Sequence, residues 1–338
     1  MFKNFLKYTI SLAVAFGLLW YVYKDLNLAA MFAKLGSVNY FWVFLSLIIA
    51  LTSHVIRAYR WNLLLSPLGY QLSTFRTFLA VMVGYFVNLL LPRMGEISRC
   101  GILKRTDDVP ITTSLGTVVA ERIIDVISLF FVIALTLLLE FQQLKDFFFG
   151  FVASTFENFN FLNLLLVLGI TGMIMLVIAL LVRARREKLG QHSLFQKIKT
   201  FAQEMLKGLT SIRRLNNRTG FWVSTVLLWV LYYLMSYTMF FTLPETSYLG
   251  LLAGLAVLTM GSLGMAAPVQ GGIGTFHILV SGVLVLYGIS EPDGVLFATL
   301  THGIQTLSFV IFGGISFAIS LLISRRKAKV QSMAKSGV

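Results

Sequence analysis

Charge is scarce in this chain of 338 residues, since only 12% of them are charged, and proline and cysteine number only six and one. So few charges cannot coat a water-soluble body of this size, because 57% of the residues are hydrophobic and the mean hydropathy is +0.82. Cys100 is the single cysteine, so the chain cannot form an internal disulfide. The sequence has no metal-ligand spacing, nucleotide-binding fingerprint or Ser/His/Asp order, so we expect no metal, no cofactor and no catalytic site.

What the chain has instead is long apolar runs, several of which exceed the ~20 residues that a helix needs to cross a bilayer. Membrane strands would alternate apolar and polar residues over ~10 positions, and these runs do not. The first run, Phe5 to Tyr23, is long and has no small-residue cleavage site after it, so it is a span and not a signal peptide. The sequence predicts an all-α integral membrane protein, a polytopic helical bundle.

Basic residues predict the topology, because Lys and Arg accumulate in cytoplasmic loops. Ten of the 28 lie in residues 183–218 and five in residues 325–335. We therefore expect a protein of the cytoplasmic (inner) membrane with both termini cytoplasmic. Arg57, Arg60 and Arg76 are assigned to the same side. Acidic residues dominate the segments expected outside, which are Glu140 to Glu157, Glu245, and Glu291 to Asp293.

The crossings then divide the chain into two halves. Residues 77–104 begin and end among basic residues, and Ile97 to Arg105 is too short and too charged for a second crossing, so a re-entrant hairpin is predicted. Three full crossings per half would place the halves in opposite orientations, as an inverted-topology repeat. The first predicted repeat is 1–141, with spans at about 5–23, 40–58 and 115–139 and a hairpin at 77–104. An external connection at 142–160 leads to the second repeat at 161–324, with spans at about 161–182, 220–242 and 295–323, a hairpin at 248–289 and the basic cytoplasmic loop at 183–218. A basic cytoplasmic tail follows at 325–338.

Each hairpin contains a Pro-Gly loop, Leu91 to Ile97 in the first and Ala267 to Ile273 in the second. The predicted helix breaks and gating positions are Pro92, Gly95, Pro268, Gly271, Gly272 and Gly274. In transporters built from inverted repeats, broken helices line a binding site near the middle of the membrane. The alternative is that these residues only kink ordinary helices, and whether 248–289 re-enters or makes two full spans is left open.

Polar residues cluster around the first loop, where Asn88, Arg93, Glu96 and Arg99 follow about helical spacing. A carboxylate at Glu96 suits the first turn of the helix after the break. Arginine binds phosphate bidentately, so Arg93 and Arg99 at a cavity mouth are candidate ligands of an anionic headgroup. Equally, the two arginines could be cytoplasmic anchors.

A second cluster, Glu121, Arg122 and Asp125, lies on one face of the span at 115–139. Each charge at that depth costs at least ~2.5–3.5 kcal/mol, so these side chains must face the bundle interior and pair. The surplus carboxylate leaves room for a basic partner or a proton, although a structural ion pair is the alternative. The second half contributes fewer polar candidates, which are Gln270, Thr275, His277, His302 and Gln305.

Three motifs, Gly84 to Arg99, Glu121 to Asp125 and Pro268 to Gly274, resemble those of the lysylphosphatidylglycerol synthase transmembrane-domain family, also called flippase-like domain proteins. The resemblance spans nearly the whole chain. It implies movement of aminoacylated phospholipid between leaflets, after a separate soluble domain has attached the amino acid. For this chain we expect translocation of lipid without synthesis of the aminoacylated lipid. The family commonly has a glutamate where this chain has His277, so roles of that acid, such as recognition of a lipid amine, are not carried over.

The net charge of +14 and the basic loop favour an anionic membrane surface over nucleic acid as a partner. Apolar and basic residues alternate at helical spacing in that loop, which predicts an amphipathic helix on the leaflet, although topological anchoring explains the charges equally well. We expect a translocase of phospholipid, aminoacylated lipid or polyprenyl-phosphate lipid in which Arg93, Arg99 and Arg122 hold the phosphate. Glu96, Glu121 and Asp125 would balance these cations or meet a basic headgroup, and Gly271 and Gly272 would gate. The alternatives are a secondary transporter of a small soluble anion and a non-catalytic scaffold beside a lipid-modifying or envelope-biosynthesis enzyme.

Overall fold

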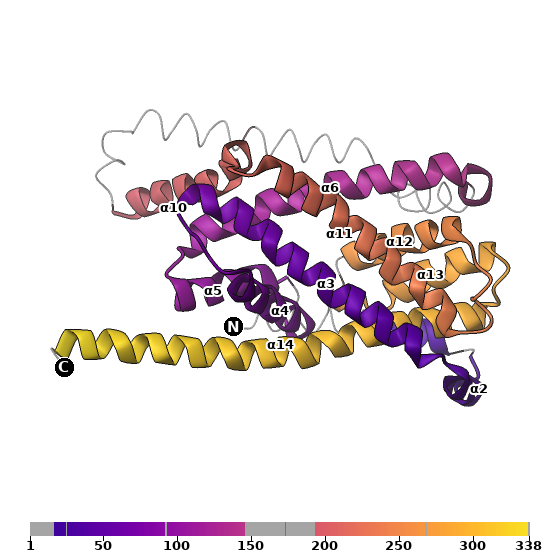
Figure 1. Ribbon diagram of the computed structural model, residues 1–338. Coiled ribbons are helices and arrows are strands. Elements are labelled where there is room, and N and C mark those ends of the chain that lie inside the picture. Colours follow the sequence, from indigo (N-terminus) through magenta and orange to yellow (C-terminus); the bar gives the residue numbers. More distant parts are fainter. Residues whose placement is uncertain are drawn as a thin grey trace.

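The computed structural model describes residues 17–24, 26–91, 93–145, 173, 193–267 and 269–336. All regular structure in these residues is helical, in agreement with the predicted all-α class (Figure 1). The α-helices are α2 (Leu28–Lys34), α3 (Tyr40–Leu65), α4 (Thr74–Leu90), α5 (Gly95–Asp107), α6 (Ile111–Leu139), α10 (Ser193–Leu209), α11 (Arg218–Thr238), α12 (Leu251–Ala266), α13 (Thr275–Leu286) and α14 (Glu291–Ser336). The 3-10 turns are η1 (Leu35–Ser37), η2 (Ser66–Leu68), η3 (Thr210–Arg214), η4 (Met239–Thr242) and η5 (Gln270–Gly272).

Four helical segments in the described part of the chain are long and apolar enough to cross a bilayer. They are Tyr40–Leu68, Ile111–Leu139, Arg218–Thr242 and Glu291–Val330. These confirm as helices the spans predicted at 40–58, 115–139, 220–242 and 295–323. The spans predicted at 5–23 and 161–182 lie largely or wholly outside the described residues, as do most of the connection at 142–160 and the start of the basic loop.

The two predicted hairpins appear as pairs of shorter helices, α4 with α5 and α12 with α13, of 17, 13, 16 and 12 residues. Each is shorter than the ~20 residues of a full crossing. The helix breaks fall at residues 91–94 and 267–274, at the two Pro-Gly loops, while Pro92 and Pro268 themselves lie outside the described residues. Re-entry of the hairpins and the division into inverted repeats stay predictions.

Short polar side chains fix where several helices begin, as expected for N-caps. The side-chain oxygen of Asn39 accepts a hydrogen bond from the Phe41 amide at the start of α3, and Asn217 caps α11 in the same way. The Ser73 hydroxyl accepts from the Arg76 amide at the start of α4. The ends of these helices are thereby set locally by the sequence.

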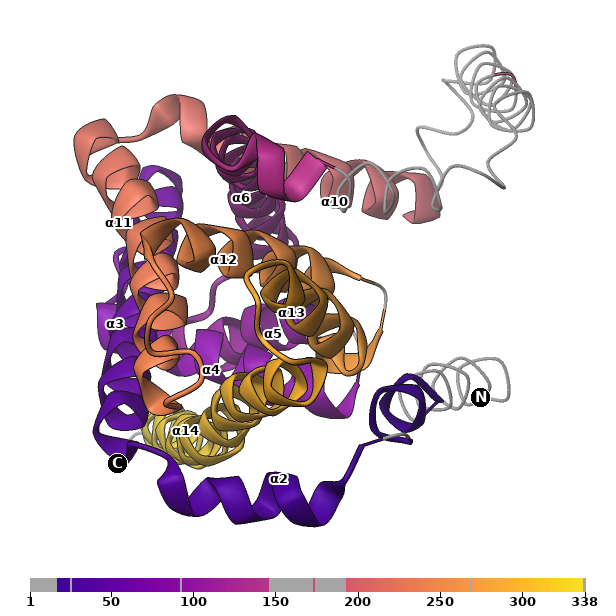
Figure 2. The ribbon, with the colours of Figure 1, turned by 90° about the vertical axis from the view of Figure 1, so that its right-hand side faces the viewer.

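The two larger hydrophobic cores of the described residues lie one around each hairpin, and a third, smaller one joins Leu64, Leu215 and Phe221. The first joins α3, α4, α5 and α6 through residues such as Trp61 and Leu103. The second joins η4, α12, α13 and the start of α14 through residues such as Phe240 and Val280. The end-on view in Figure 2 shows α4 and α5 behind α12 and α13, with α3, α11 and α14 around them.

Glycines permit close helix approach, which is a common basis of packing in membranes. A Cβ on Gly84 would lie 3.0 Å from the carbonyl oxygen of Gly95, so α4 and α5 touch through their backbones. A Cβ on Gly313 of α14 would lie 2.6 Å from Cβ of Phe86 on α4. In the first hairpin, α4 is therefore packed tightly against both α5 and α14.

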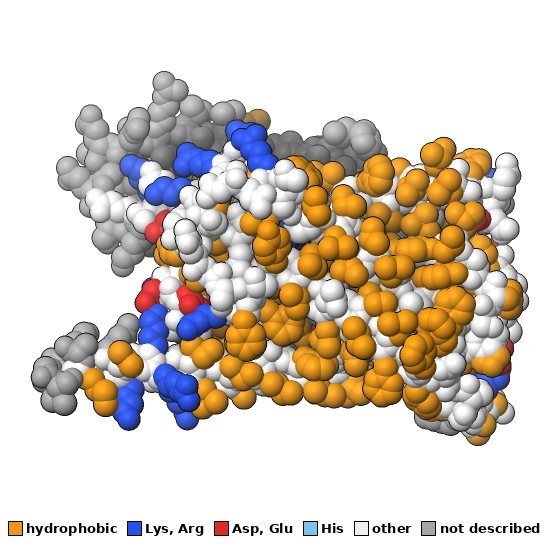
Figure 3. All heavy atoms as spheres, viewed as in Figure 1, with side chains coloured by type: hydrophobic (Ala, Val, Ile, Leu, Met, Phe, Trp, Pro, Cys, Tyr) orange, Lys and Arg blue, Asp and Glu red, His pale blue; other side chains and the backbone are white. Residues whose placement is uncertain are grey.

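The surface of the bundle is apolar along its middle, where Figure 3 shows hydrophobic side chains spread over this face. Phe44 on α3, Phe131 on α6 and Val226 on α11 are 62%, 69% and 64% exposed. So many large apolar side chains facing outward fit contact with lipid. Basic side chains gather at the end that carries α10 and the end of α14 (Figure 3).

Ion pairs connect the elements at each end of α14. At its start, the Lys34 ammonium pairs with Asp293 and, at 2.7 Å, with Glu245. The hydrogen bonds to these two carboxylates raise the pKa of Lys34. Towards its other end, Lys327 pairs with Asp108, which follows α5, at 2.5 Å. The long helix thus contacts the base of the first hairpin at one end and the α2 region at the other (Figure 1).

The helix predicted in the basic loop is present as α10, which packs against α6. Gly208 of α10 and Gly116 of α6 face each other so closely that neither has space for a Cβ. Phe201 and Leu206 remain 47% and 57% exposed. One side of this amphipathic helix is therefore used for packing within the protein, and contact of the rest with an anionic leaflet stays a prediction.

Candidate functional site

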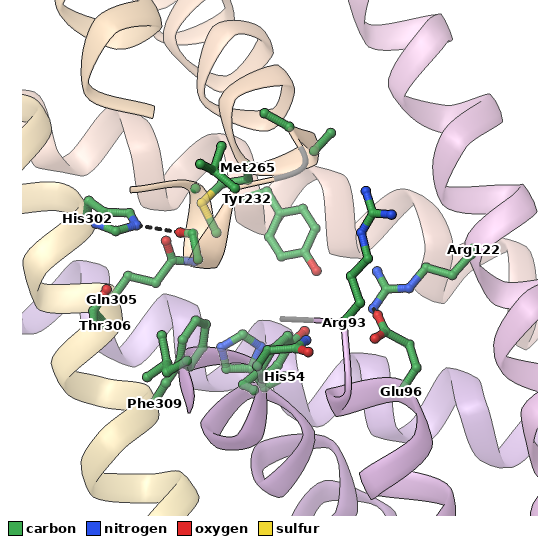
Figure 4. A pocket seen from close by; sticks show the side chains of 18 residues that line it. His54, Arg93, Glu96, Arg122, Tyr232, Met265, His302, Gln305, Thr306 and Phe309 are labelled. Atoms are coloured by element: carbon green, nitrogen blue, oxygen red, sulfur yellow. Dashed lines mark hydrogen bonds and ion pairs between the residues drawn. The ribbon is translucent and has the colours of Figure 1, made fainter. Parts of the chain in front are cut away.

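The two chain breaks meet in the interior of the bundle. The side-chain amide of Gln270, in the second break, donates a hydrogen bond of 2.6 Å to the carbonyl oxygen of Leu89, at the end of α4. A cavity of about 340 Å³ lies between the breaks (Figure 4). Its lining consists of His54, Tyr85, Asn88, Leu89, Arg93, Glu96, Arg122, Tyr232, Met265, Ala266, Ala267, Val269, Gly271, Gly272, His302, Gln305, Thr306 and Phe309.

The first break presents two charged side chains to this cavity, Arg93 and Glu96. Arg93 has a left-handed backbone with φ of 61°, which is uncommon for a residue with a side chain. The side-chain oxygen of Asn88 accepts a 2.7 Å hydrogen bond from the amide of Gly95, which satisfies a free donor at the start of α5. Glu96 lies in the first turn of α5, as the sequence predicts. No described residue forms an ion pair or hydrogen bond with the Arg93 guanidinium.

The second break is shaped by glycine and held by its neighbours. Gly271, Gly272 and Gly274 all have positive φ, at 60°, 72° and 85°, which other residues rarely adopt. The Thr275 hydroxyl donates a 2.7 Å hydrogen bond to the carbonyl of Gly264, and Nδ1 of His277 accepts from the Gly274 amide at 3.4 Å. Thr275 and His277 thus support the loop from behind and lie outside the cavity lining.

His302 on α14 joins the second break to the cavity. Its Nε2 lies 2.8 Å from the carbonyl oxygen of Gly271, and because a carbonyl only accepts, this nitrogen donates. The His302 and His277 rings meet edge to face, with centroids 5.1 Å apart. The pair of histidines therefore fixes the glycine loop on the side opposite the first break.

A buried cluster of charges lies behind the cavity wall. Glu121 is fully buried and accepts hydrogen bonds from Arg57, Arg60 and Arg99 at 3.0, 3.2 and 2.9 Å. Asp125 accepts from Arg60 at 2.6 Å and from Arg57 at 3.0 Å. The cluster is therefore fully hydrogen-bonded on its acid side, as charges inside a membrane protein require.

Two groups connect this cluster to the cavity. The Tyr232 hydroxyl accepts hydrogen bonds from Arg57 at 3.3 and 3.0 Å and also lines the cavity. Arg122 pairs with Glu96 at 3.1 Å and stands 3.8 Å from Asp125. A charge that enters the cavity would act on both Tyr232 and Arg122.

The surplus carboxylate of α6 has the basic partners for which the sequence left room. They include Arg57 and Arg60 of α3, which the sequence assigned to the cytoplasmic side of the membrane and not to this cluster. Both are buried, at 5% and 0% exposure. The available signal was that Arg57 falls inside the span predicted at 40–58, one turn from Arg60, so both share a helix face.

The predicted site residues divide into two groups. Those that line the cavity are Asn88, Arg93, Glu96, Arg122, Gly271, Gly272, His302 and Gln305. Those that support it from outside the lining are Arg99, Glu121, Asp125, Gln270, Thr275 and His277. Arg99 is 3% exposed, pairs with Glu121 and lies over the Trp61 ring at 4.6 Å, instead of standing at the cavity mouth.

Sequence reasoning missed the polar and aromatic lining side chains His54, Tyr85, Tyr232, Thr306 and Phe309, besides the apolar ones. His54 is 4% exposed and packs against the rings of Tyr85 and Phe309, with centroids at 4.8 and 5.6 Å. In the sequence, His54 precedes Arg57 by three residues, which places the two on one face of α3. The aromatic residues carry no comparable signal in an apolar helix.

Fold and site together define a polytopic helical membrane protein with a polar internal cavity between two helix breaks. The chain belongs to the lysylphosphatidylglycerol synthase TM region family, whose model matches residues 8–313. The family is related to lipid handling, and the match confirms the resemblance found in the motifs. The UPF0104 membrane protein MJ1595 of Methanocaldococcus jannaschii is 32% identical over 129 residues, which are 37% of this chain and 38% of that protein. The similarity therefore covers well under half of that relative, and no solved structure was found to match.

Proposed function

We propose that this protein is a lipid translocase, which moves a phosphate-bearing lipid between the leaflets of a membrane through the cavity between its two helix breaks. The lipid headgroup enters the cavity while the acyl chains stay in the bilayer. The observation that carries the proposal is the guanidinium of Arg93, which has no ion pair or hydrogen bond among the described residues and lies with Arg122 in the cavity lining. Membership of a family related to lipid handling supports it.

The charge balance favours an anionic ligand. The cavity wall and the cluster behind it contain five guanidiniums (Arg57, Arg60, Arg93, Arg99 and Arg122) against three carboxylates (Glu96, Glu121 and Asp125). An anionic counter-charge can reach this excess of two positive charges, since Arg93 is exposed and the Arg122 side chain is 42% exposed. A phosphate supplies that charge, and guanidinium groups bind phosphate in a bidentate geometry.

The size of the cavity supports a headgroup as its occupant. Ligand pockets usually measure about 300–1,000 Å³, so a cavity of about 340 Å³ is at the small end of this range. It can take a phosphate with a small polar substituent, whereas the two acyl chains of a phospholipid must remain outside. The same volume also fits a small soluble anion, which is the second candidate substrate.

The ion pairs at the ends of the bundle support the proposed topology. The base of the first hairpin pairs through Asp108 with Lys327, at the basic end that carries α10, which we assign to the cytoplasm. The base of the second hairpin lies near Asp293, which pairs with Lys34 at the opposite end. The hairpins would then enter from opposite sides, as in an inverted repeat of the cytoplasmic membrane.

Leaflet exchange of fluorescent phospholipids in proteoliposomes tests this function. We expect Arg93→Gln and Arg122→Gln to slow exchange at least about tenfold, since each removes a charge that faces the headgroup. Lys104→Gln is the matched control, because Lys104 is exposed on α5 away from the cavity and loses the same charge. If folded Arg93→Gln and Arg122→Gln proteins move lipid at the unmodified rate, the cavity is not the route.

A parallel measurement tests whether the substrate is a small soluble anion instead of a lipid. Thermal stabilisation of the purified protein by inorganic phosphate or other soluble anions, with none by phospholipid, would favour a transporter of soluble anions. Stabilisation by phospholipid supports the translocase.

A further inference from the structure

The cavity has two chemically different sides. Figure 4 shows Arg93, Arg122 and Glu96 on one side of it, and His302, Gln305 and Thr306 of α14 on the other, with His54 below the space between. One side is therefore ionic, whereas the other has only neutral hydrogen-bonding groups. A ligand that fits both must have an anionic part and a neutral polar part.

The neutral side has hydrogen-bonding capacity that the protein does not use. Both ring nitrogens of His54 are buried without a partner. Within the described part of the chain, no hydrogen bond is formed by the side-chain amide of Gln305 or by the hydroxyl of Thr306. Buried polar groups normally have partners, because leaving them unpaired costs free energy. Hydroxyl groups of a ligand, which donate and accept, can reach the partly exposed side chains of Gln305 and Thr306, whereas the ring nitrogens of His54 are closed off from the cavity.

Packing keeps this side in place. The rings of Tyr85 and Phe309 are stacked at 4.6 Å with 17° between their planes, and the His54 ring lies against both. His302 is held by its bond to Gly271. The hydrogen-bonding groups are thus presented on rigid helices, which is the arrangement that gives a binding site its specificity.

The cavity offers little to an amine. Among the described residues that line it, Glu96 is the only carboxylate, and Glu96 already pairs with Arg122 at 3.1 Å. An ammonium group in the cavity would have to take Glu96 from Arg122 and would also lie near the Arg93 guanidinium. Like charges in such a site are disfavoured, so the cavity discriminates by repulsion as well as by attraction.

From this arrangement, and resting on the proposed function, we propose that the cavity selects phosphodiester lipids whose headgroup is a neutral polyol or sugar, and that it discriminates against headgroups that bear amines. Arg93 and Arg122 hold the phosphate, while Gln305 and Thr306 bind the hydroxyl groups. Aminoacylated lipids are therefore poor ligands of this chain.

A lipid-retention competition tests the selectivity. The purified protein is incubated with an equimolar mixture of phosphatidylglycerol, phosphatidylmethanol, phosphatidylethanolamine and lysylphosphatidylglycerol, and bound lipids are measured by mass spectrometry. Phosphatidylmethanol has the same charge as phosphatidylglycerol but no hydroxyl groups, so the pair isolates the neutral side of the cavity. We expect phosphatidylglycerol to be retained at least about fivefold over each of the others.

Two variants test whether Gln305 and Thr306 cause the preference for phosphatidylglycerol. Gln305→Leu and Thr306→Val are expected to lower retention of phosphatidylglycerol to the level of phosphatidylmethanol and to leave phosphatidylmethanol unchanged. Gln142→Leu, at an exposed position, is the control for loss of an amide. Equal retention of the two anionic lipids by the unmodified protein, or dominance of lysylphosphatidylglycerol, overturns the selectivity even where leaflet exchange is observed.

Transport and selectivity are separated by measuring both. Selective retention of phosphatidylglycerol without leaflet exchange of any lipid supports the selectivity and refutes the translocase. Soluble glycerophosphoglycerol has the same headgroup without acyl chains, and it serves as a competitor. If an equimolar amount displaces the bound phosphatidylglycerol, the ligand is a soluble phosphodiester and selection of lipid is overturned.

Discussion

The side chain of Gln270 and the backbone carbonyl of Leu89 are joined by a hydrogen bond of 2.6 Å. This bond fastens the second helix break to the last turn of α4, which leads into the first break. The two breaks are 181 residues apart in the chain, yet they form one structural unit around the cavity. Opening the cavity at this point requires the bond to break.

Loss of that bond is the first prediction. Gln270→Leu removes the donor and leaves the Leu89 carbonyl without it, so we expect a loss of about 1–3 kcal/mol in the free energy of unfolding. Thermal unfolding of the purified protein measures this, with Gln143→Leu at an exposed position as the control. An unchanged unfolding temperature would mean that the breaks are held together by other contacts.

The buried cluster gives the second prediction. Glu121→Gln removes the acid shared by three guanidiniums, and breaking such buried pairs costs about 3–5 kcal/mol. Glu245→Gln removes a partly exposed acid from Lys34 and is expected to cost at most about 1 kcal/mol. Yield of folded protein and thermal unfolding distinguish the two, and similar behaviour of both variants would contradict the role given to Glu121.

Two glycines of α5 provide a third, matched comparison. A Cβ on Gly95 would collide with the Gly84 carbonyl and the Asn88 side chain, whereas a Cβ on Gly101 meets nothing within 4 Å. Gly95→Ala should therefore separate α4 from α5 and lower the unfolding temperature. Gly101→Ala should leave it unchanged or raise it, since alanine favours a helix interior by up to about 1 kcal/mol. The opposite order in thermal unfolding would show that the hairpin is not packed through Gly95.

His277 gives a fourth prediction, which concerns stability without selectivity. His277 accepts from the Gly274 amide and lies outside the cavity lining. His277→Ala should lower the unfolding temperature, because the start of α13 loses its cap, while the order of preference among lipid headgroups stays the same. A changed preference in the retention experiment would place His277 in contact with the ligand.

Local features of the sequence predicted much of this fold. The spans at 40–58 and 115–139 are long apolar runs, and the breaks fall at the Pro-Gly loops because proline and glycine act on the backbone next to them. Glu96 was placed in the first turn of α5 for the same local reason. Such features need no knowledge of distant partners.

The pairing inside the bundle could not be predicted in the same way. Glu121 meets Arg57 across 64 residues and Arg99 across 22, and nothing in the local pattern specifies which charges will face each other. The positive-inside tendency assigned Arg57 and Arg60 to the cytoplasmic side and says nothing of their partners, because it treats every arginine near a helix end alike. The free hydrogen-bonding groups of His54 likewise became visible only when α3, α4 and α14 were brought together.

The length of α14 has a mechanical consequence. Its 46 residues extend about 70 Å, and the side chains that line the cavity lie in the first half of that length. Lys34 holds one end of this rod and Asp108 holds a point near the other. Because contacts with other elements hold the rod on both sides of the cavity, a tilt at Gln305 would have to strain the contact of Lys34 or that of Lys327.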